Sequence, residues 1–198
     1  KVKTSGSTGR PKTLEVTKHY MAASAHRTLE ALQLAPHNTA LLCLPLDYVA
    51  GKMMTVRTLV GNLPLIAVAP SSHPLRHQQV APSFIAVTPM QALTTLQTPG
   101  ERECFCRIPR ILIGGGAVSQ QLLAAVQACE GEVYSTYGMT ETLSHIALRR
   151  LNGPSAADAY TPLPDVSLSV DESGRLLIHD PLTTPRPLLT NDRAELRP

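Results

Sequence analysis

The stretch FIAVTPMQALTTLQ, residues 84–97, decides the fold because it contains a strand and the helix that follows it. Phe84 to Thr88 form a short run of apolar and β-branched residues, which is typical of a strand buried inside a sheet. Pro89 comes next, and proline is favoured in the first turn of a helix, because an N–H at that position would have no partner within the helix. We therefore predict a buried strand over 84–88 and a helix over 89–97.

The same order of strand and helix repeats along most of the chain. Thr17 is a suitable N-cap for a helix over 18–33, in which apolar residues recur every three to four positions. Further strands are predicted over 13–17, 40–44, 63–68, 110–113 and 132–136, and further helices over 51–61 and from a Ser119 cap to Cys129. Strict alternation requires crossover connections between parallel strands. We predict an α/β fold with a mostly parallel sheet covered by helices on both faces.

The pattern changes after residue 145. Residues 166–170 and 175–178 have strand character, and the turn residues 171–174 separate them. Prolines are dense over 181–187. We predict a small β-rich subdomain over 146–198, which follows an α/β part over 1–145.

Composition limits the partners of the chain. Its 198 residues carry a net charge of +3 and no long basic run, so nucleic acid is not predicted as a partner. No apolar stretch approaches the roughly 18 residues of a membrane span, so membrane insertion is not predicted either. Three of the four cysteines lie in apolar or helical patterns, which indicates reduced thiols and a cytoplasmic location. No second pair completes a metal site with Cys104 and Cys106.

The segment KTSGSTGRPK, residues 3–12, is dense in hydroxyls, glycines and cations. It is not a Walker loop, which needs two glycines five apart, because Gly6 and Gly9 are three apart and Pro11 precedes Lys12. Glycine N–H groups, hydroxyls and a lysine can still converge on a phosphate. The alternative is a solvated, flexible linker.

Two further stretches follow predicted strands. Residues 113–117, IGGGA, put three glycines where a strand ends and a helix begins, and a glycine backbone admits close approach of a ligand there. Residues 137–142, YGMTET, put a ring, a hydroxyl and a carboxylate at the end of the next strand. Each stretch alone has a structural explanation, which is a tight turn for the first and packing, capping and solvation for the second.

Taken together and in this order, the motifs resemble those of the AMP-forming adenylating superfamily, which includes acyl-CoA synthetases, luciferases and peptide-synthetase adenylation domains. Residues 4–12, TSGSTGRPK, match its phosphate loop, with Thr13 where glycine is usual. Residues 113–117 are similar to its adenine-side glycine turn, and residues 137–141, YGMTE, match its central motif. Residues 188–196, LLTNDRAEL, are similar to its ribose-binding motif, with Asn191 replacing the usual glycine.

The resemblance implies ATP and Mg²⁺ as cofactors and coenzyme A as co-substrate. The implied reaction adenylates a carboxylic acid, releases pyrophosphate and passes the acyl group to the thiol, in an α/β part that binds nucleotide and acyl group. Thr140 would bind the α-phosphate and Glu141 would hold Mg²⁺, so these two are the predicted catalytic residues. The other implied nucleotide contacts are Thr4, Ser5, Gly6, Ser7, Thr8, Gly9 and Lys12 for the β- and γ-phosphates, Gly115, Gly116 and Tyr137 around the adenine or acyl pocket, and Asp192 for the ribose.

The stretch LPLDYVAGKMMTVR, residues 44–57, is similar to the o-succinylbenzoate–CoA ligases of menaquinone biosynthesis, which have an arginine at the position of Arg57. The resemblance implies that Arg57 neutralises the carboxylate of an aromatic dicarboxylate that does not react, with Lys52 as the competing cation. Asp47 and Tyr48 differ from the Phe-His pair common in those enzymes. The alternative for Arg57 is a solvated position on a helix surface.

Three functions stay open at this point. The first is a CoA ligase for o-succinylbenzoate, and the second is another acyl- or aryl-CoA ligase or a carrier-loading adenylation domain. The third is a non-catalytic nucleotide-binding module. Superfamily members continue into a small C-terminal lid domain with a catalytic lysine, and we expect that domain and the N-terminal part of the large domain to lie outside this chain. A homodimer is left open.

Overall fold

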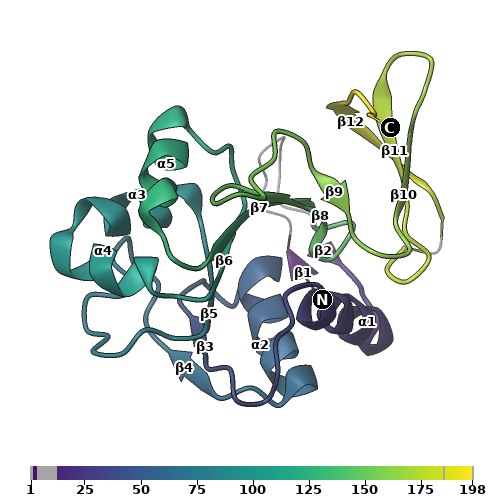
Figure 1. Ribbon diagram of the computed structural model, residues 1–198. Helices are drawn as coiled ribbons and strands as arrows, with labels where there is room; N and C mark the ends of the chain where they lie inside the picture. Colours follow the sequence, from purple (N-terminus) through teal and green to yellow (C-terminus); the bar gives the residue numbers. More distant parts are fainter. Residues whose placement is uncertain (1, 4–12, 185, 198) are drawn as a thin grey trace.

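One large sheet organises the computed structural model, which describes residues 2–3, 13–184 and 186–197 (Figure 1). Its strands are β3 (Ala40–Leu42), β4 (Leu65–Ala67), β5 (Phe84–Val87), β6 (Arg110–Ile113), β7 (Glu132–Gly138), β8 (His145–Arg150) and β9 (Thr161–Pro162). They lie in the order β4-β3-β5-β6-β7-β8-β9. The strands from β4 to β7 are parallel, and β8 and β9 are antiparallel to their neighbours. The predicted α/β fold with a mostly parallel sheet is confirmed.

Helices lie on both sides of this sheet. The helices α1 (Lys18–Ala31) and α2 (Val49–Gly61) pack against each other on one side (Figure 1). On the other side lie α3 (Pro89–Gln97), α4 (Pro99–Cys106) and α5 (Gln120–Ala125), which a 3₁₀ turn over Val126–Ala128 extends. The central strands are therefore covered from both faces, and Ile85 and Ile111 have no exposed surface. Within the part of the chain that the structure describes, no helix has the length and apolar character needed to cross a membrane.

Polar caps fix the starts of three helices. The side chain of Thr17 accepts a hydrogen bond from Tyr20 N at 3.2 Å, and Ser119 caps α5 in the same way, so both predicted caps are confirmed. Thr88 forms a capping box with Gln91, in which each residue's side chain accepts from the other's backbone N–H. With Pro89 in its first turn, α3 begins and ends where the sequence predicts it.

The prediction missed two features. Helix α4 starts at Pro99, directly after Thr98 ends α3, and the sequence gives no gap between the two helices. Strands β8 and β9 fall in the segment predicted to begin the β-rich subdomain, yet β8 pairs with β7 and β9 pairs with β8 in the large sheet. The large sheet therefore extends to Pro162. The division of the chain into two functional parts at residue 145 stays a prediction.

A smaller antiparallel sheet follows the large one. It contains β10 (Ser167–Val170), β11 (Arg175–His179) and β12 (Leu188–Arg193), in that order. Its apolar side chains Leu176 and Ile178 pack with Ile146 of β8 into a second, smaller core. The predicted pair of strands with a turn between them is present. At the other end of the chain, β1 (Val2–Lys3) and β2 (Thr13–Leu14) pair antiparallel on either side of residues 4–12.

Candidate nucleotide and acyl site

The turn between β7 and β8 carries the central motif, residues 137–141. Thr142 holds this turn closed, because its Oγ1 accepts from Met139 N at 3.0 Å and lies 2.8 Å from Ser144 O. The two ends of the turn approach so closely that a Cβ on Gly138 would lie 2.2 Å from Ser144 O. Only glycine fits at that position. The motif is thus held against the first residues of β8.

The glycine turn after β6 lies beside this motif, because β6 and β7 are neighbouring parallel strands. Gly115 has a φ of 80°, a left-handed conformation that glycine adopts without strain. Gly115 and Gly116 are exposed. Their backbone is therefore accessible at the carboxyl edge of the sheet, where ligands bind in open α/β folds.

Tyr137 and Asp192, both predicted to contact the nucleotide, meet across the two sheets. The hydroxyl of Tyr137 donates to Asp192 Oδ2 at 2.6 Å. Burial and this carboxylate raise the pKa of Tyr137, so the phenol stays protonated and remains the donor. The side chain of Thr190 accepts from Asp192 N at 3.1 Å and fixes the backbone beside the carboxylate. The ring and the carboxylate are therefore prepositioned as one unit, although they are 55 residues apart.

The predicted catalytic residues Thr140 and Glu141 line one pocket of about 290 Å³. The pocket is bounded by the segment that enters α1 and by the turn after β11. Its other lining residues are Leu14, Glu15, Val16, Thr17, Tyr20, Leu143, Thr183 and Thr184. Glu141 is exposed and Thr140 is half-buried, so both are accessible to a ligand. Because the pocket begins at residue 14, it lies directly after the segment that matches the phosphate loop.

The donor set of this pocket fits magnesium. Its side chains offer carboxylate oxygens from Glu15 and Glu141 and several threonine hydroxyls, and Mg²⁺ prefers hard oxygen ligands. Within the described ranges, 2–3, 13–184 and 186–197, no three His, Cys, Asp or Glu side chains come together in a metal-binding group. One or two carboxylates that share the ion with substrate phosphates are the usual arrangement for Mg²⁺.

Arg57, the predicted substrate cation, is buried, with 2% of its surface exposed. Its Nη2 donates to Ser144 Oγ, three residues beyond the central motif, and its Nε has no partner. Among the residues that the structure describes, no carboxylate lies within ion-pair distance of it. Burial lowers the pKa of Arg57 to about 10, so the guanidinium is still charged at neutral pH. The solvated helix-surface alternative for Arg57 is therefore wrong.

Lys52, the competing cation, lies five residues before Arg57 on α2. Five residues correspond to about 140° around a helix, so the two side chains leave it in different directions. Lys52 is half-buried, whereas Arg57 contacts the turn that follows the motif. The structure thus brings Arg57 to Ser144, three residues beyond the motif.

Sequence reasoning missed a buried ion pair that connects α1 to the turn after β11. Arg27 Nη1 and Nη2 donate to the two carboxylate oxygens of Asp180 at 3.0 and 2.7 Å, and both side chains are buried. Thr183 Oγ1 also donates to this carboxylate. Two oppositely charged residues 153 positions apart give no local pattern, so no signal in the sequence could have found them.

The residues of the predicted phosphate loop, Thr4, Ser5, Gly6, Ser7, Thr8, Gly9 and Lys12, lie outside the described residues. Their roles stay predictions. What the structure adds is the position of β1 and β2, which pair at the two ends of this segment.

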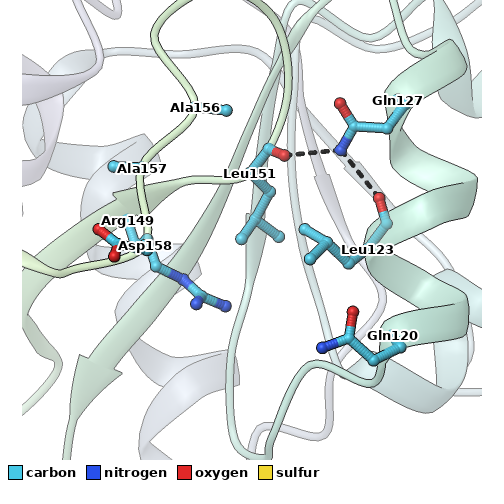
Figure 2. Close-up of a pocket in the computed structure, with 8 residues that line it drawn as sticks. All are labelled: Gln120, Leu123, Gln127, Arg149, Leu151, Ala156, Ala157 and Asp158. Carbon is cyan, nitrogen blue, oxygen red and sulfur yellow. Dashed lines mark hydrogen bonds between the residues drawn. The ribbon is translucent and has the colours of Figure 1, made fainter.

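A second depression, of about 400 Å³, lies between α5 and the loop after β8 (Figure 2). The Gln127 amide at its edge donates to Leu123 O at 2.9 Å and to Leu151 O at 2.8 Å, so this amide is used within the protein. Its lining contains none of the predicted site residues that the structure describes. The pocket lined by Thr140 and Glu141 is therefore the candidate site, although the other depression is larger.

Comparison with known proteins identifies the family of this chain. The family described as AMP-binding enzyme matches residues 4–181. A 2-succinylbenzoate–CoA ligase of Bacillus cytotoxicus is 27% identical over 179 residues, which cover 88% of this chain and 37% of the relative. The chain spans about a third of the length of the curated relatives it matches.

Solved structures share the fold over nearly the whole chain. An acyl-CoA synthetase (AMP-forming)/AMP-acid ligase II-like protein from Dyadobacter fermentans has a TM-score of 0.92 and 39% identity, and covers 99% of this chain and 56% of its own. The O-succinylbenzoate coenzyme A synthetase of Bacillus subtilis, solved with ATP and magnesium ion, has a TM-score of 0.74 at 21% identity, over 94% of this chain and 42% of its own. The second likeness concerns the fold alone.

Proposed function

The chain belongs to the AMP-binding enzyme family, and from this premise we propose that it forms the nucleotide- and acyl-binding part of an ATP-dependent acid–thiol ligase. The proposed reaction joins a carboxylic acid to AMP with release of pyrophosphate and then transfers the acyl group to coenzyme A. The proposed acid is o-succinylbenzoate, an aromatic dicarboxylate. The curated relatives named as 2-succinylbenzoate–CoA ligases support this choice.

The observation that carries the substrate proposal is the buried, unpaired charge of Arg57. A guanidinium removed from water requires a counter-charge, and no described carboxylate supplies one to Arg57. A substrate with one reacting and one non-reacting carboxylate would supply it. Arginine suits this task because its planar fork binds a carboxylate through two parallel hydrogen bonds.

The nucleotide is proposed to occupy the pocket at the carboxyl edge of the sheet. There Thr140 would donate to the α-phosphate, and Tyr137 and Asp192 would orient the base and the ribose. Glu141, with Glu15 nearby, would hold Mg²⁺, which would neutralise phosphate charge when bound. The residues of this chain thus supply position and hydrogen-bond donors, which is what adenylation requires as charge builds on the phosphate oxygens.

Titration calorimetry of o-succinylbenzoate with this chain and its Arg57→Ala variant tests the proposal. A charge-assisted contact contributes about 1.5–3 kcal/mol, so the variant should bind the dicarboxylate roughly ten- to 150-fold more weakly. Its affinity for ATP should stay within about twofold. Arg57→Lys should recover only part of the loss, because an ammonium cannot reproduce the planar fork.

Lys52→Ala is the matched comparison, since it removes the other cation of the same helix. Circular dichroism should show that each variant is folded before its affinity is compared. Dicarboxylate binding that survives Arg57→Ala and disappears with Lys52→Ala would move the role to Lys52. If neither substitution changed it, the o-succinylbenzoate proposal would be wrong and only the family membership would stand.

A further inference from the structure

A buried chain of hydrogen bonds connects Arg57 to α1. Arg57 Nη2 donates to Ser144 Oγ, and Ser144 Oγ lies 3.3 Å from Nδ1 of the neighbouring His145. On the other side of the ring, His145 Nε2 lies 3.2 Å from Thr28 Oγ1. This series of hydrogen bonds ends at Ser24 O, which accepts from Thr28 Oγ1 at 3.1 Å. Arg57, His145, Thr28 and Ser24 are buried, and Ser144 is half-buried.

The available protons fix the direction of this chain. The hydroxyl of Thr28 has one hydrogen, which it donates to Ser24 O, so Thr28 can only accept from His145. His145 must therefore carry its proton on Nε2, which leaves Nδ1 as an acceptor for the Ser144 hydroxyl. Ser144 in turn accepts from Arg57 with a free lone pair. Each proton in the chain is used once, and no two donors face each other.

Charge favours the same state of the ring. Burial lowers the pKa of His145 well below its ordinary value, and the guanidiniums of Arg57 and Arg27 lower it further. A protonated ring would add a third positive charge to this buried cluster. It would also turn Nδ1 into a donor, so the Ser144 hydroxyl would lose its acceptor.

We propose that His145 is a positioning residue for the acyl-binding arginine. As a neutral imidazole with its proton on Nε2, it orients the Ser144 hydroxyl, and this hydroxyl holds the guanidinium of Arg57 in one rotamer. The inference rests on the proposed function of Arg57 and adds two residues to the machinery that binds the second carboxylate. Its physical basis is that an arginine fixed in advance loses less side-chain entropy when it binds.

The tautomer can be measured on this chain without any substrate. In ¹⁵N-labelled protein at pH 7, long-range proton–nitrogen NMR should show one histidine with a protonated Nε2 and an unprotonated Nδ1. The signals of this residue should disappear in His145→Asn, which assigns them. A proton on Nδ1, or on both nitrogens, at pH 7 would overturn the proposed direction of the chain.

Binding measurements test the positioning role. A hydrogen bond from a charged group contributes about 1.5–3 kcal/mol and a neutral one about 0.5–1.5 kcal/mol, so Ser144→Ala should weaken o-succinylbenzoate binding by about ten- to 150-fold and His145→Leu by about two- to tenfold. His145→Asn should restore most of the affinity, because its Oδ1 can take the place of Nδ1 as acceptor. Binding of ATP, and of 4-oxo-4-phenylbutanoate, which lacks the ring carboxylate, should not change in any of the three.

These outcomes separate the inference from the proposed function. If Arg57→Ala weakens dicarboxylate binding and His145→Leu does not, the positioning role is wrong and the substrate proposal stands. If Arg57→Ala itself has no effect, the substrate proposal fails and the acyl-site role of His145 fails with it. The NMR result decides the hydrogen-bond chain in either case.

A second inference rests on a separate pair of cysteines at the amino ends of β6 and β7. Cys106 at the end of α4 and Cys129 after the 3₁₀ turn have their sulfurs 3.1 Å apart, about 1 Å more than in a disulfide. Glu130 N donates to Cys106 O at 2.9 Å and holds the two segments together. The hydrogen bond from the Cys129 thiol and the charge of Arg102 lower the pKa of Cys106, which favours its thiolate.

We propose that Cys106 and Cys129 form a disulfide when the protein meets hydrogen peroxide. The Cys106 thiolate attacks one peroxide oxygen, the O–O bond breaks, and after protonation a sulfenic acid and one water result. The Cys129 sulfur then attacks the sulfenic sulfur, the S–O bond breaks, and a second water leaves with the Cys129 proton. Two thiols are oxidised and one peroxide is reduced to two waters.

Peptide mapping of the chain under non-reducing conditions tests this proposal. After treatment with about one equivalent of peroxide, peptides containing Cys106 and Cys129 should be crosslinked, two of the four thiols should be lost, and dithiothreitol should restore them. Cys104→Ser should crosslink like the wild type, and Cys129→Ser should stop at an oxidised Cys106. Cys43 should stay free, because burial raises its pKa to about 12. Four free thiols after treatment, or oxidation of Cys106 without a crosslink, would overturn the proposal.

Discussion

At the scale of single residues, Glu141 is the clearest test of the proposed chemistry. The Glu141→Gln substitution keeps the shape of the side chain and removes its charge. If Glu141 holds Mg²⁺, the variant should lose at least about tenfold in adenylation rate, because the metal then stabilises less phosphate charge. The measurement is ATP–pyrophosphate exchange by the protein that carries this sequence.

Glu172→Gln is the control for this experiment, since Glu172 is exposed on the turn between β10 and β11. It should leave the exchange rate unchanged. An unchanged rate in Glu141→Gln as well would show that this carboxylate does not bind the metal.

Gly138 gives a second prediction at this scale. In Gly138→Ala the new methyl group would lie 2.2 Å from Ser144 O, so the turn that carries the motif would have to open. We expect a loss of roughly 1–3 kcal/mol in the free energy of unfolding, as for overpacked sites. Urea denaturation measures it.

The matched substitution is Gly100→Ala in α4, where a Cβ would meet nothing within 4 Å. It should be neutral or stabilising, because alanine is the better helix residue. Equal stability of the two variants would show that the close approach at Gly138 is relaxed at little cost.

Much of the candidate site could be predicted at the residue scale because its motifs are local in the sequence. The structure brings Tyr137 to Asp192 and puts Thr140 and Glu141 in one pocket. The burial of Arg57 and its contact with Ser144 could not be predicted, because they depend on how α2 packs against a turn 87 residues away. His145 belongs to none of the sequence motifs, so its role can be inferred only from its hydrogen bonds in the structure.

At the scale of elements, the ion pair between Arg27 and Asp180 joins α1 to the turn that follows β11. Asp180→Asn would leave the buried Arg27 charge without its counter-charge. Removing one partner of a buried pair costs about 3–5 kcal/mol, so the variant should be much less stable to urea than the wild type. Since Thr183 and Thr184 bond to Asp180 and line the pocket proposed for the nucleotide, ATP binding should weaken too.

Asp158→Asn is the comparison, because Asp158 forms an exposed ion pair with Arg197 at the surface. Exposed pairs contribute little, so this variant should unfold like the wild type. If Asp180→Asn were as stable as Asp158→Asn, the buried pair would not be what ties the second sheet to α1.

Elements with their own start signals were predictable, and elements defined by their partners were not. Thr17, Ser119 and Pro89 mark helix starts in the sequence, and each helix begins there. Helix α4 has a proline start but no loop separates it from α3, and it is not among the helices predicted from the sequence. The sequence places strand β8 in the separate β region, because its pairing with β7 leaves no signal in the local sequence.

At the scale of the whole molecule, one histidine should make the fold sensitive to acid. Burial and two guanidiniums depress the pKa of His145 in the folded protein well below the value of 6.5 that it has when unfolded. Between those two values the unfolded chain binds a proton that the folded protein does not bind. Stability therefore rises with pH in that window and is lost as pH falls below about 6.5.

The slope due to one proton is at most about 1.4 kcal/mol per pH unit. Urea denaturation at several pH values between 7.5 and 5 should show this loss in the wild type and a smaller one in His145→Asn, which has no proton to bind there. His37→Asn, in an exposed loop, should keep the wild-type slope. Equal slopes for the wild type and His145→Asn would mean that the ring takes up its proton equally in both states. The neutral imidazole that we infer between Ser144 and Thr28 would then be wrong.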